Sequence, residues 1–249
     1  MAKKIGICIP TNLQQTYTEF WMQVCRIQAH AFKAGYDVEI YRGDGYTPAE
    51  CHDMAIEQAM MDGAEAVLIM GTDEIHPTNI IPWFDSQPAD IIVPLVYMRR
   101  EPYSTVLFHA IQDQPDGKDT KPISLFAAMA NAPESDDPLF QVDAAGSGGM
   151  FIRRAVLEKV PMPWFQDLVD FRIKHPFTYR LLGHDIVFCI KAKTHGFKVY
   201  CDLRCRSAHL SLFAIDDNFR NRLNGGLWAP DPNVRKTNVD DCKDEEAAG

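Results

Sequence analysis

Two adjacent carboxylates and an imidazole follow an apolar run in the first third of the chain. The run covers residues 66–70, and Asp73, Glu74 and His76 come shortly after it. Carboxylates crowded together lose solvation unless a cation lies among them. Magnesium and manganese prefer oxygen ligands, so this stretch indicates a metal site that faces an anionic ligand. The alternative is a helix start, at which Thr72 or Asp73 caps the first turn.

Three more distant stretches also carry candidate chemistry. The glycines of residues 146–149 permit a bend or a close approach of backbone to a ligand, although the lysine of a P-loop is missing. Asp185 opens an amphipathic helix, where it is either a cap or a catalytic base. His209 ends the last predicted strand. It is either a structural hydrogen-bonding group or, if it meets Asp73, part of a metal site.

The first 96 residues alternate between strand and helix patterns, and these elements must position the candidate groups. We expect strands at 4–10, 38–41, 66–70 and 90–96, and helices at 17–34, 48–61 and 75–84. This alternation predicts a mainly parallel sheet with helices on both faces. Ligands bind at the carboxyl ends of the strands in such sheets. Asp73 and the step Pro10-Thr11 both follow strands at that edge.

The rest of the chain changes character after the fourth expected strand. Residues 97–140 carry many turn formers and weak periodicity. Bent or paired strand is expected at 140–152, helices at 154–160 and 185–195, and strands at 198–202 and 207–210. We predict a single α/β domain over residues 1–213. A C-terminal extension over 214–249 is expected to form a lid followed by a disordered acidic tail.

Bulk composition narrows the functional classes. The 249 residues are 46% hydrophobic and 24% charged, which is typical of a soluble globular protein. No apolar run approaches the roughly 18 residues of a membrane span, and no cleavable signal is evident. We therefore expect a cytoplasmic protein without membrane insertion. The net charge of −9 disfavours a broad nucleic-acid surface.

The cysteine pattern favours reduced thiols. There are seven cysteines without a CxxC pair. Cys201 and Cys205, with His195 and His209 nearby, could also be interpreted as a zinc cluster. The alternating strand pattern disfavours that interpretation, because Cys201 would point away from its neighbours.

Taken in chain order, these motifs resemble the GT-A glycosyltransferases, particularly the family-2-like members, over about residues 4–210. Pro10-Thr11 matches the end of the first strand near the nucleotide base. Residues 71–77 resemble the DxD motif with its following hydrophobic residue and proline. Residues 146–154 match the small-residue segment that lines the donor and acceptor pocket. The segment from His184, which opens the helix with the base, through to His209 matches the remainder.

The resemblance implies a GT-A (Rossmann-like) fold and a glycosyltransferase that uses a UDP- or GDP-sugar. Asp73 and His209 would hold Mn²⁺ or Mg²⁺, and Asp185 would deprotonate the acceptor hydroxyl with inversion. A retaining course follows if Asp185 only orients the acceptor. The donor would bind at Pro10, Thr11, Asp73, Gly148 and Gly149. The acceptor is left open among a glycan, a protein, a small molecule and modified nucleic acid.

Three positions depart from the family pattern. Gly71 replaces the first acid of DxD, His184 replaces the acid before the base, and His52-Asp53 replaces an Arg-Asn pair. One alternative is therefore a nucleotide-sugar-binding protein without transferase activity. The other is a sugar nucleotidyltransferase, which would need a glycine-rich basic loop after the first strand. Residues 10–14 contain neither glycine nor a basic side chain.

Overall fold

The computed structural model describes residues 2–11, 16–99, 101–112, 124–175 and 178–210. All of them belong to the unit Met1–Asp216. The expected extension at 214–249 lies outside the described residues. Among the helices that are described, none combines the length and apolarity needed to cross a membrane.

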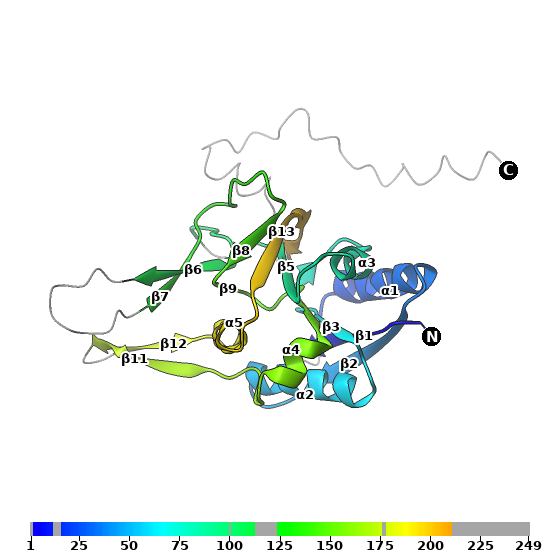
Figure 1. Ribbon diagram of the computed structural model, residues 1–249, viewed down its shortest axis with the longest axis horizontal. Coiled ribbons are helices and arrows are strands. Elements are labelled where there is room, and N and C mark those ends of the chain that lie inside the picture. The colour runs from blue at the N-terminus through cyan, green and yellow to red at the C-terminus, as the bar shows by residue number, and fades with distance from the viewer. Residues whose placement is uncertain (1, 12–15, 100, 113–123, 176–177, 211–249) are drawn as a thin grey trace. The chain divides into compact units, whose positions relative to one another are not determined.

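A seven-stranded mixed sheet forms the centre of this unit, in the order β2-β1-β3-β10-β5-β13-β8 (Figure 1). Five strands run in one direction: β1 (Lys4–Pro10), β2 (Asp37–Gly43), β3 (Ala66–Ile69), β5 (Ile91–Leu95) and β13 (Val199–Arg206). Two run against them: β10 (Phe151–Arg153) and β8 (Leu139–Val142). The expected α/β fold with a mainly parallel sheet is confirmed. The carboxyl ends of the five parallel strands lie at one edge, which we call the carboxyl edge.

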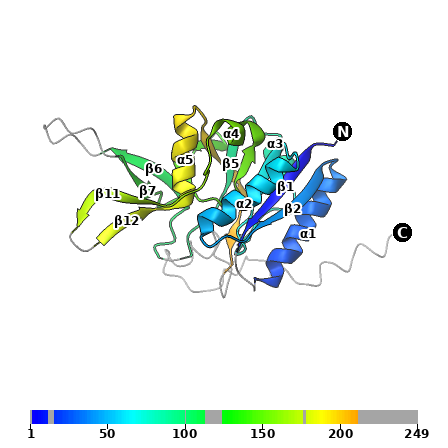
Figure 2. The ribbon, with the colours of Figure 1, turned by 90° about the horizontal axis from the view of Figure 1, so that it is seen from below.

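Helices cover both faces of the sheet (Figures 1 and 2). On one face, α1 (Thr18–Lys33) and α3 (Ile80–Asp85) share a fully buried core with alternate residues of β1. On the other face, α2 (Pro48–Met61) lies against β1 and β2, where Ala59 approaches Gly6. A capping box of Thr47 and Glu50 starts α2, so its first turn is fixed at the carboxyl edge. The short α4 (Arg154–Lys159) and α5 (His184–Thr194) complete the helices.

The expected helix over 75–84 is wrong in its first turn. Glu74–Ile75 forms a short strand, β4, and α3 begins only at Ile80. Pro77 disfavours helical backbone at the residue before it. In addition, β4 pairs antiparallel with β14 (Ala208–His209), far away in the sequence. This pairing supplies β4 with hydrogen-bond partners that a local pattern does not reveal.

Two smaller sheets extend the unit beyond what the sequence pattern indicated. One contains β7 (Ser124–Ala128), β6 (Leu107–Gln112) and β9 (Ala144–Ala145), and the other is the hairpin of β11 (Leu168–His175) and β12 (Thr178–Leu182). They lie on the side of α5 away from β1 and β2 (Figure 1). Since β9 leads directly into residues 146–149, the first of these sheets fixes where the glycine segment enters the carboxyl edge.

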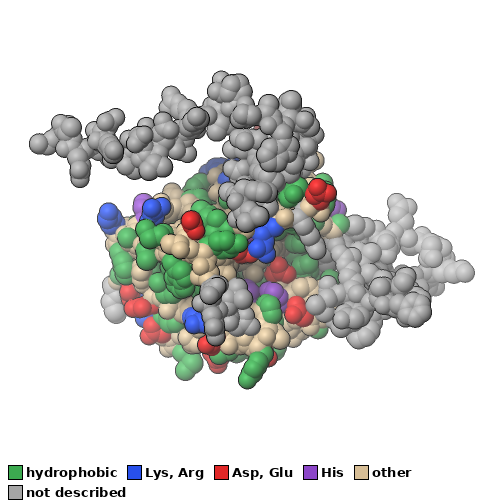
Figure 3. All heavy atoms as spheres, turned by 180° about the vertical axis from the view of Figure 1, so that it is seen from behind, with side chains coloured by type: hydrophobic (Ala, Val, Ile, Leu, Met, Phe, Trp, Pro, Cys, Tyr) green, Lys and Arg blue, Asp and Glu red, His purple; other side chains and the backbone are tan. Residues whose placement is uncertain are grey.

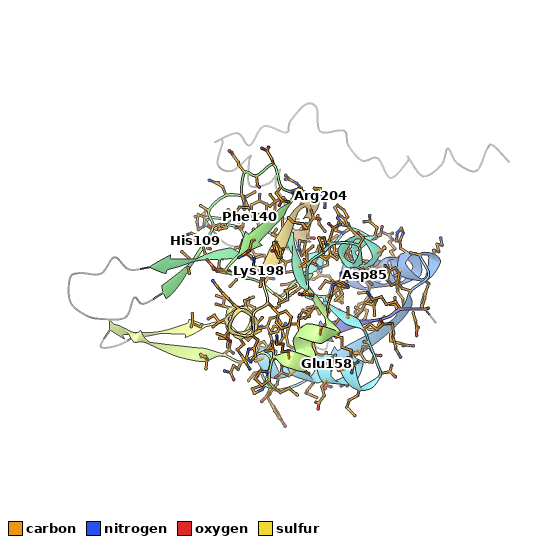
Figure 4. The ribbon with its side chains drawn as sticks, in the orientation of Figure 1. Asp85, His109, Phe140, Glu158, Lys198 and Arg204 are labelled. Atoms are coloured by element: carbon orange, nitrogen blue, oxygen red, sulfur yellow. The ribbon has the colours of Figure 1, made fainter. Side chains whose placement is uncertain are left out.

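At the opposite edge of the sheet, one carboxylate accepts hydrogen bonds from three side chains. Asp85, labelled in Figure 4, accepts hydrogen bonds from Lys3 at 2.5 Å, Arg153 at 2.8 Å and the Tyr36 hydroxyl at 3.1 Å. Burial opposes the charge of Asp85, but these donors outweigh it and lower its pKa. The network ties α3 to the starts of β1 and β2 and to the end of β10.

Candidate functional site

The pairing of β4 with β14 brings Asp73 and Glu74 close to His209. Glu74 lies directly opposite His209 in this pairing, and the Leu210 amide donates to the Asp73 carbonyl at 2.6 Å. The His209 Nε2 atom is 2.9 Å from Glu74 Oε1. On its other side His209 donates through Nδ1 to the Tyr97 carbonyl. The imidazole is therefore held at both nitrogens.

Asp73, Glu74 and His209 form a candidate metal centre. One ligand atom from each lies within 4.8 Å of the other two. Asp73 is partly exposed, whereas Glu74 is buried. The Arg99 Nη1 atom lies 2.7 Å from Asp73 Oδ2. The cluster thus contains two carboxylates, one imidazole and a guanidinium at the carboxyl edge. Figure 3 shows a face on which acidic, basic and histidine side chains gather around a hollow.

A second histidine lies behind Glu74. His76 is buried, with Nδ1 2.9 Å from the Ser207 hydroxyl and Nε2 3.4 Å from Glu74 Oε2. Within the described residues, neither His76 Nε2 nor Glu74 Oε2 makes a hydrogen bond. Burial lowers the pKa of His76, so this imidazole is neutral near pH 7.

Glu74 and His209 form an ion pair. Burial disfavours the charge on Glu74, but the hydrogen bond from His209 outweighs it, so the Glu74 pKa is lowered. Burial also acts against a charged His209, but the bond to Glu74 prevails and raises the His209 pKa. The buried carboxylate thus carries its charge with an imidazolium as partner.

The glycines of residues 146–149 leave room for these side chains. A Cβ atom at Gly148 would lie 1.8 Å from Glu74 Oε2, and one at Gly149, where φ is +71°, would lie 2.8 Å from His76 Cε1. A Cβ atom at Gly146 would be 3.8 Å from Asp185 Oδ2. Any side chain at Gly148 would displace the Glu74 carboxylate. The glycine segment thus lies next to both the candidate metal centre and Asp185, the expected catalytic base.

Asp185 lies in the first turn of α5, half-buried beside this segment. Its Oδ1 atom accepts a hydrogen bond from the Ile186 amide at 2.8 Å. Burial raises the Asp185 pKa, although the adjacent His184 acts in the opposite direction. His184 in turn lies 3.4 Å from an Asp167 carboxylate oxygen. A carboxylate with a raised pKa near a glycine-lined space is suited to accept a proton.

His52, at the position where the GT-A glycosyltransferases that the sequence resembles carry an arginine, contacts the glycine segment from α2. Its Nδ1 donates to the Pro48 carbonyl at 2.7 Å, and its Nε2 lies 2.9 Å from the Ser147 hydroxyl. The ring stacks on Phe165, with centroids 4.6 Å apart. Burial lowers its pKa to about 3, so His52 is neutral and accepts from Ser147. It positions the segment without contributing charge.

The expected nucleotide-binding step, Pro10-Thr11, follows β1, which is the direct neighbour of β3 in the sheet. Thr11 is buried, and its amide donates to the Gly43 carbonyl at 2.9 Å. Arg42 Nε lies 3.4 Å from the Thr11 carbonyl. Pro10 and Thr11 therefore lie at the carboxyl edge, as expected. Their contact with a nucleotide stays a prediction, as do the donor contacts of Gly148 and Gly149.

A cavity of about 840 Å³ opens beside the start of α2 and the segment 163–167. Five carboxylates contribute to its wall: Asp44, Glu50, Asp53, Glu57 and Asp167. Among the described residues that line it, none is Lys or Arg. A diphosphate would be repelled there. The cluster of Asp73, Glu74 and His209, with its adjacent guanidinium, is the better place for that group.

The residues of the cluster fit a divalent cation. Two carboxylates and an imidazole are ligands that Mn²⁺ and Mg²⁺ accept. The buried Glu74 Oε2, without a hydrogen bond among the described residues, is an oxygen for which a cation would be a suitable partner. His209 would bind a cation through Nε2 after losing the proton of that atom, because Nδ1 is held by a backbone carbonyl. The expected metal pair Asp73 and His209 thus gains Glu74 as a third candidate.

Two contributions were not identified by sequence reasoning. One is the Tyr97 carbonyl that orients His209, and the other is His52 behind Ser147. Arg99 belongs to the pair Arg99-Arg100, which in the sequence alone indicates either diphosphate contact or a solvated surface. A useful signal was its position four residues after β5, because the end of β5 lies at the same edge as the end of β3.

Comparison with known proteins supports the fold. No protein-family model matches the chain, and no curated protein does. Among solved structures, A197 from STIV is similar with a TM-score of 0.53 and 14% identity, covering 88% of this chain and 91% of that chain. At this identity the likeness concerns the α/β fold alone.

A second solved structure is a putative glucose-1-phosphate thymidylyltransferase from Bacillus anthracis. It has a TM-score of 0.37 and 10% identity, covering 93% of this chain and 98% of that chain. A score this low supports no conclusion about function.

Proposed function

We propose that this protein is a metal-assisted glycosyltransferase that moves a sugar from a nucleotide-sugar, a UDP- or GDP-sugar, to an acceptor hydroxyl. The observation that carries the proposal is the convergence at the carboxyl edge. Asp73, Glu74 and His209 offer ligand atoms within 4.8 Å of one another. The glycine segment links this cluster to the carboxylate of Asp185.

The parts divide the work of glycosyl transfer between them. Asp73, Glu74 and His209 would hold Mn²⁺ or Mg²⁺, which supplies Lewis-acid stabilisation of a leaving diphosphate. Pro10 and Thr11 would contact the nucleotide, and the backbone of 148–149 the sugar. Asp185 would take the proton of the acceptor hydroxyl, because its raised pKa makes it a better proton acceptor than an ordinary aspartate. Attack from that side implies inversion.

The alternative is a nucleotide-sugar-binding protein without transferase activity. Two features favour this alternative. Gly71 removes an acid that could bind a metal, and Arg99 already neutralises Asp73 without a metal. A sugar nucleotidyltransferase is less compatible with the chain. The step after β1 has neither the glycines nor the basic side chains that such an enzyme needs.

Nucleoside diphosphate release separates these possibilities. The protein is incubated with a panel of UDP- and GDP-sugars, with and without Mn²⁺, and free UDP or GDP is measured. We expect Mn²⁺-dependent release from one donor, reduced at least about 100-fold in Asp185→Asn. Glu158→Gln, an exposed carboxylate on α4 (Figure 4), is the control and should retain full activity. Binding without any release would favour the non-catalytic alternative.

A further inference from the structure

The loop after β5 delivers two groups to the metal cluster. Tyr97 pairs with Thr105 in an isolated bridge, and the Met98 amide donates to the Ser104 carbonyl at 2.8 Å. The loop is therefore closed on itself at the carboxyl edge. From it the Tyr97 carbonyl holds His209, and Arg99 reaches Asp73.

Arg99 and a divalent cation would compete for the same carboxylate. The guanidinium Nη1 lies 2.7 Å from Asp73 Oδ2, while Asp73 also belongs to the group whose ligand atoms lie within 4.8 Å. A divalent ion beside Asp73 would meet a like charge at close range. Because the two cations repel each other at this distance, one of them must move away from Asp73.

Arg99 is free to be the one that moves. Its side chain is 51% exposed, whereas Glu74 and His209 are 8% and 12% exposed. The Glu74 carboxylate also occupies the space that a side chain at Gly148 would fill. A displaced guanidinium would stay at the carboxyl edge, where its planar donors suit the oxygens of a phosphate.

We propose that Arg99 is a built-in cation of this site. It neutralises Asp73 while no divalent ion is bound, and its remaining donors contact the diphosphate of the donor both before and after a divalent ion takes its place beside Asp73. The inference rests on the proposed function for the identity of the anion. Its consequences are a metal affinity limited by Arg99 and a binding of nucleoside diphosphate that persists without metal.

The first arm of the test is a calorimetric titration with Mn²⁺ alone. Arg99→Met removes the charge but keeps much of the side chain. We expect this variant to bind Mn²⁺ about two- to fivefold more tightly than wild type, the worth of an exposed ion pair. Lys193→Met is the matched control. Lys193, near the C-terminal end of α5, also pairs with an aspartate, Asp143, and the two side chains are about as exposed as those of Arg99 and Asp73. The control should leave Mn²⁺ affinity unchanged.

The second arm is a titration with UDP and GDP in the presence of a chelator. We expect Arg99→Met to bind the preferred nucleotide at least about tenfold more weakly than wild type, and Arg99→Lys to lose less. Equal Mn²⁺ affinities in wild type and Arg99→Met, or no Mn²⁺ binding to either, would overturn the competition. Unchanged metal-free nucleotide affinity would overturn the phosphate role.

These results are separable from a failure of the proposed function. If wild type binds neither UDP nor GDP, with or without Mn²⁺, the proposed function fails. The Mn²⁺ arm then still decides whether Arg99 competes for Asp73. If wild type binds nucleotide normally and Arg99→Met behaves like wild type in both arms, only the Arg99 inference fails.

Discussion

Charge at single residues decides what this site can hold. A buried carboxylate is costly unless it is paired, and Glu74 lies between His209 at 2.9 Å and His76 at 3.4 Å. Only His209 carries a raised pKa, whereas the pKa of His76 is lowered. One positive partner therefore balances Glu74, and Asp73 takes Arg99. The two carboxylates that posed the question in the sequence are each matched by a cation.

Gly148 tests whether the Glu74 position depends on the glycine. In Gly148→Ala the new methyl group would lie 1.8 Å from Glu74 Oε2, so the carboxylate must move. We expect a loss of about 1–3 kcal/mol in the free energy of unfolding, measured in urea. Gly146→Ala is the control, since its methyl group would meet Val106 at 3.3 Å and should cost less than half as much. Equal losses would contradict this packing role.

Asp185 can be tested through the pH dependence of donor turnover. Because burial raises its folded pKa, the ionised base is lost at a higher pH than for an ordinary aspartate near 3.9. Donor turnover should therefore begin to fall, with decreasing pH, above the range in which an ordinary aspartate takes up its proton. Asp185→Asn should lower turnover about 10²–10⁴-fold while unfolding at the wild-type urea concentration. A variant with more than half of the wild-type rate would exclude Asp185 as the base.

Some of these residues could be predicted from sequence and others could not. Asp73 and His209 could be placed at one edge because both follow predicted strands of one sheet. The inward direction of Glu74 depends on the register Glu74↔His209, a contact between residues 135 positions apart. The neutral state of His52 depends on burial against Phe165. Neither follows from a local pattern.

At the scale of elements, strand ends position the site and short-range patterns located them well. The strands of the first half were expected close to where they lie, since each is an apolar run with a turn signal after it. The piece that was wrong is the two-residue strand β4, and the hairpins β6–β7 and β11–β12 were not expected. β4 is too short to show a period, and only its pairing with β14 defines it.

The contact between α2 and the segment before α5 gives a prediction for stability. Asp53 on α2 accepts from the Phe165 amide at 2.9 Å, and burial raises its pKa to about 6. The folded state thus binds more protons than the unfolded state between about pH 4 and pH 6. Stability should decrease as pH rises through this window, by about 1 kcal/mol after allowance for solvent screening.

Asp53→Asn should remove that component, because an amide does not titrate but can still accept the Phe165 hydrogen bond. The measurement is urea unfolding at pH 4, 5, 6 and 7 for wild type and variant. Glu57→Gln, exposed one turn later on α2, is the control and should follow wild type. A variant whose curve parallels wild type over the whole range would show that Asp53 does not titrate as described.

At the scale of the whole molecule, the proposed function requires an acidic chain to bind an anionic ligand. The net charge is −9, and the large cavity beside α2 is lined by carboxylates. A nucleoside diphosphate is attracted only where local cations outweigh this field. Arg99 and a bound divalent ion would provide that reversal at the carboxyl edge. The fold places Arg99 there, while the overall composition would not have suggested it.

Ligand binding should therefore stabilise the whole unit most when metal and nucleotide act together. A ligand at about 100 times its dissociation constant adds roughly 2.7 kcal/mol to the free energy of unfolding. We expect UDP or GDP with Mn²⁺ to raise the thermal midpoint, and a chelator to reverse most of the gain. An identical gain in Asp73→Ala would place the ligand elsewhere.

The most direct measurement is a calorimetric titration of wild type with a panel of nucleoside diphosphates, each with and without Mn²⁺. Asp73→Ala removes the carboxylate at the centre of the cluster, and Glu158→Gln controls for the loss of a distant one. We predict that one nucleotide binds more tightly with Mn²⁺, and that Asp73→Ala but not Glu158→Gln loses this dependence. No binding of any nucleoside diphosphate under either condition would contradict the proposed glycosyltransferase.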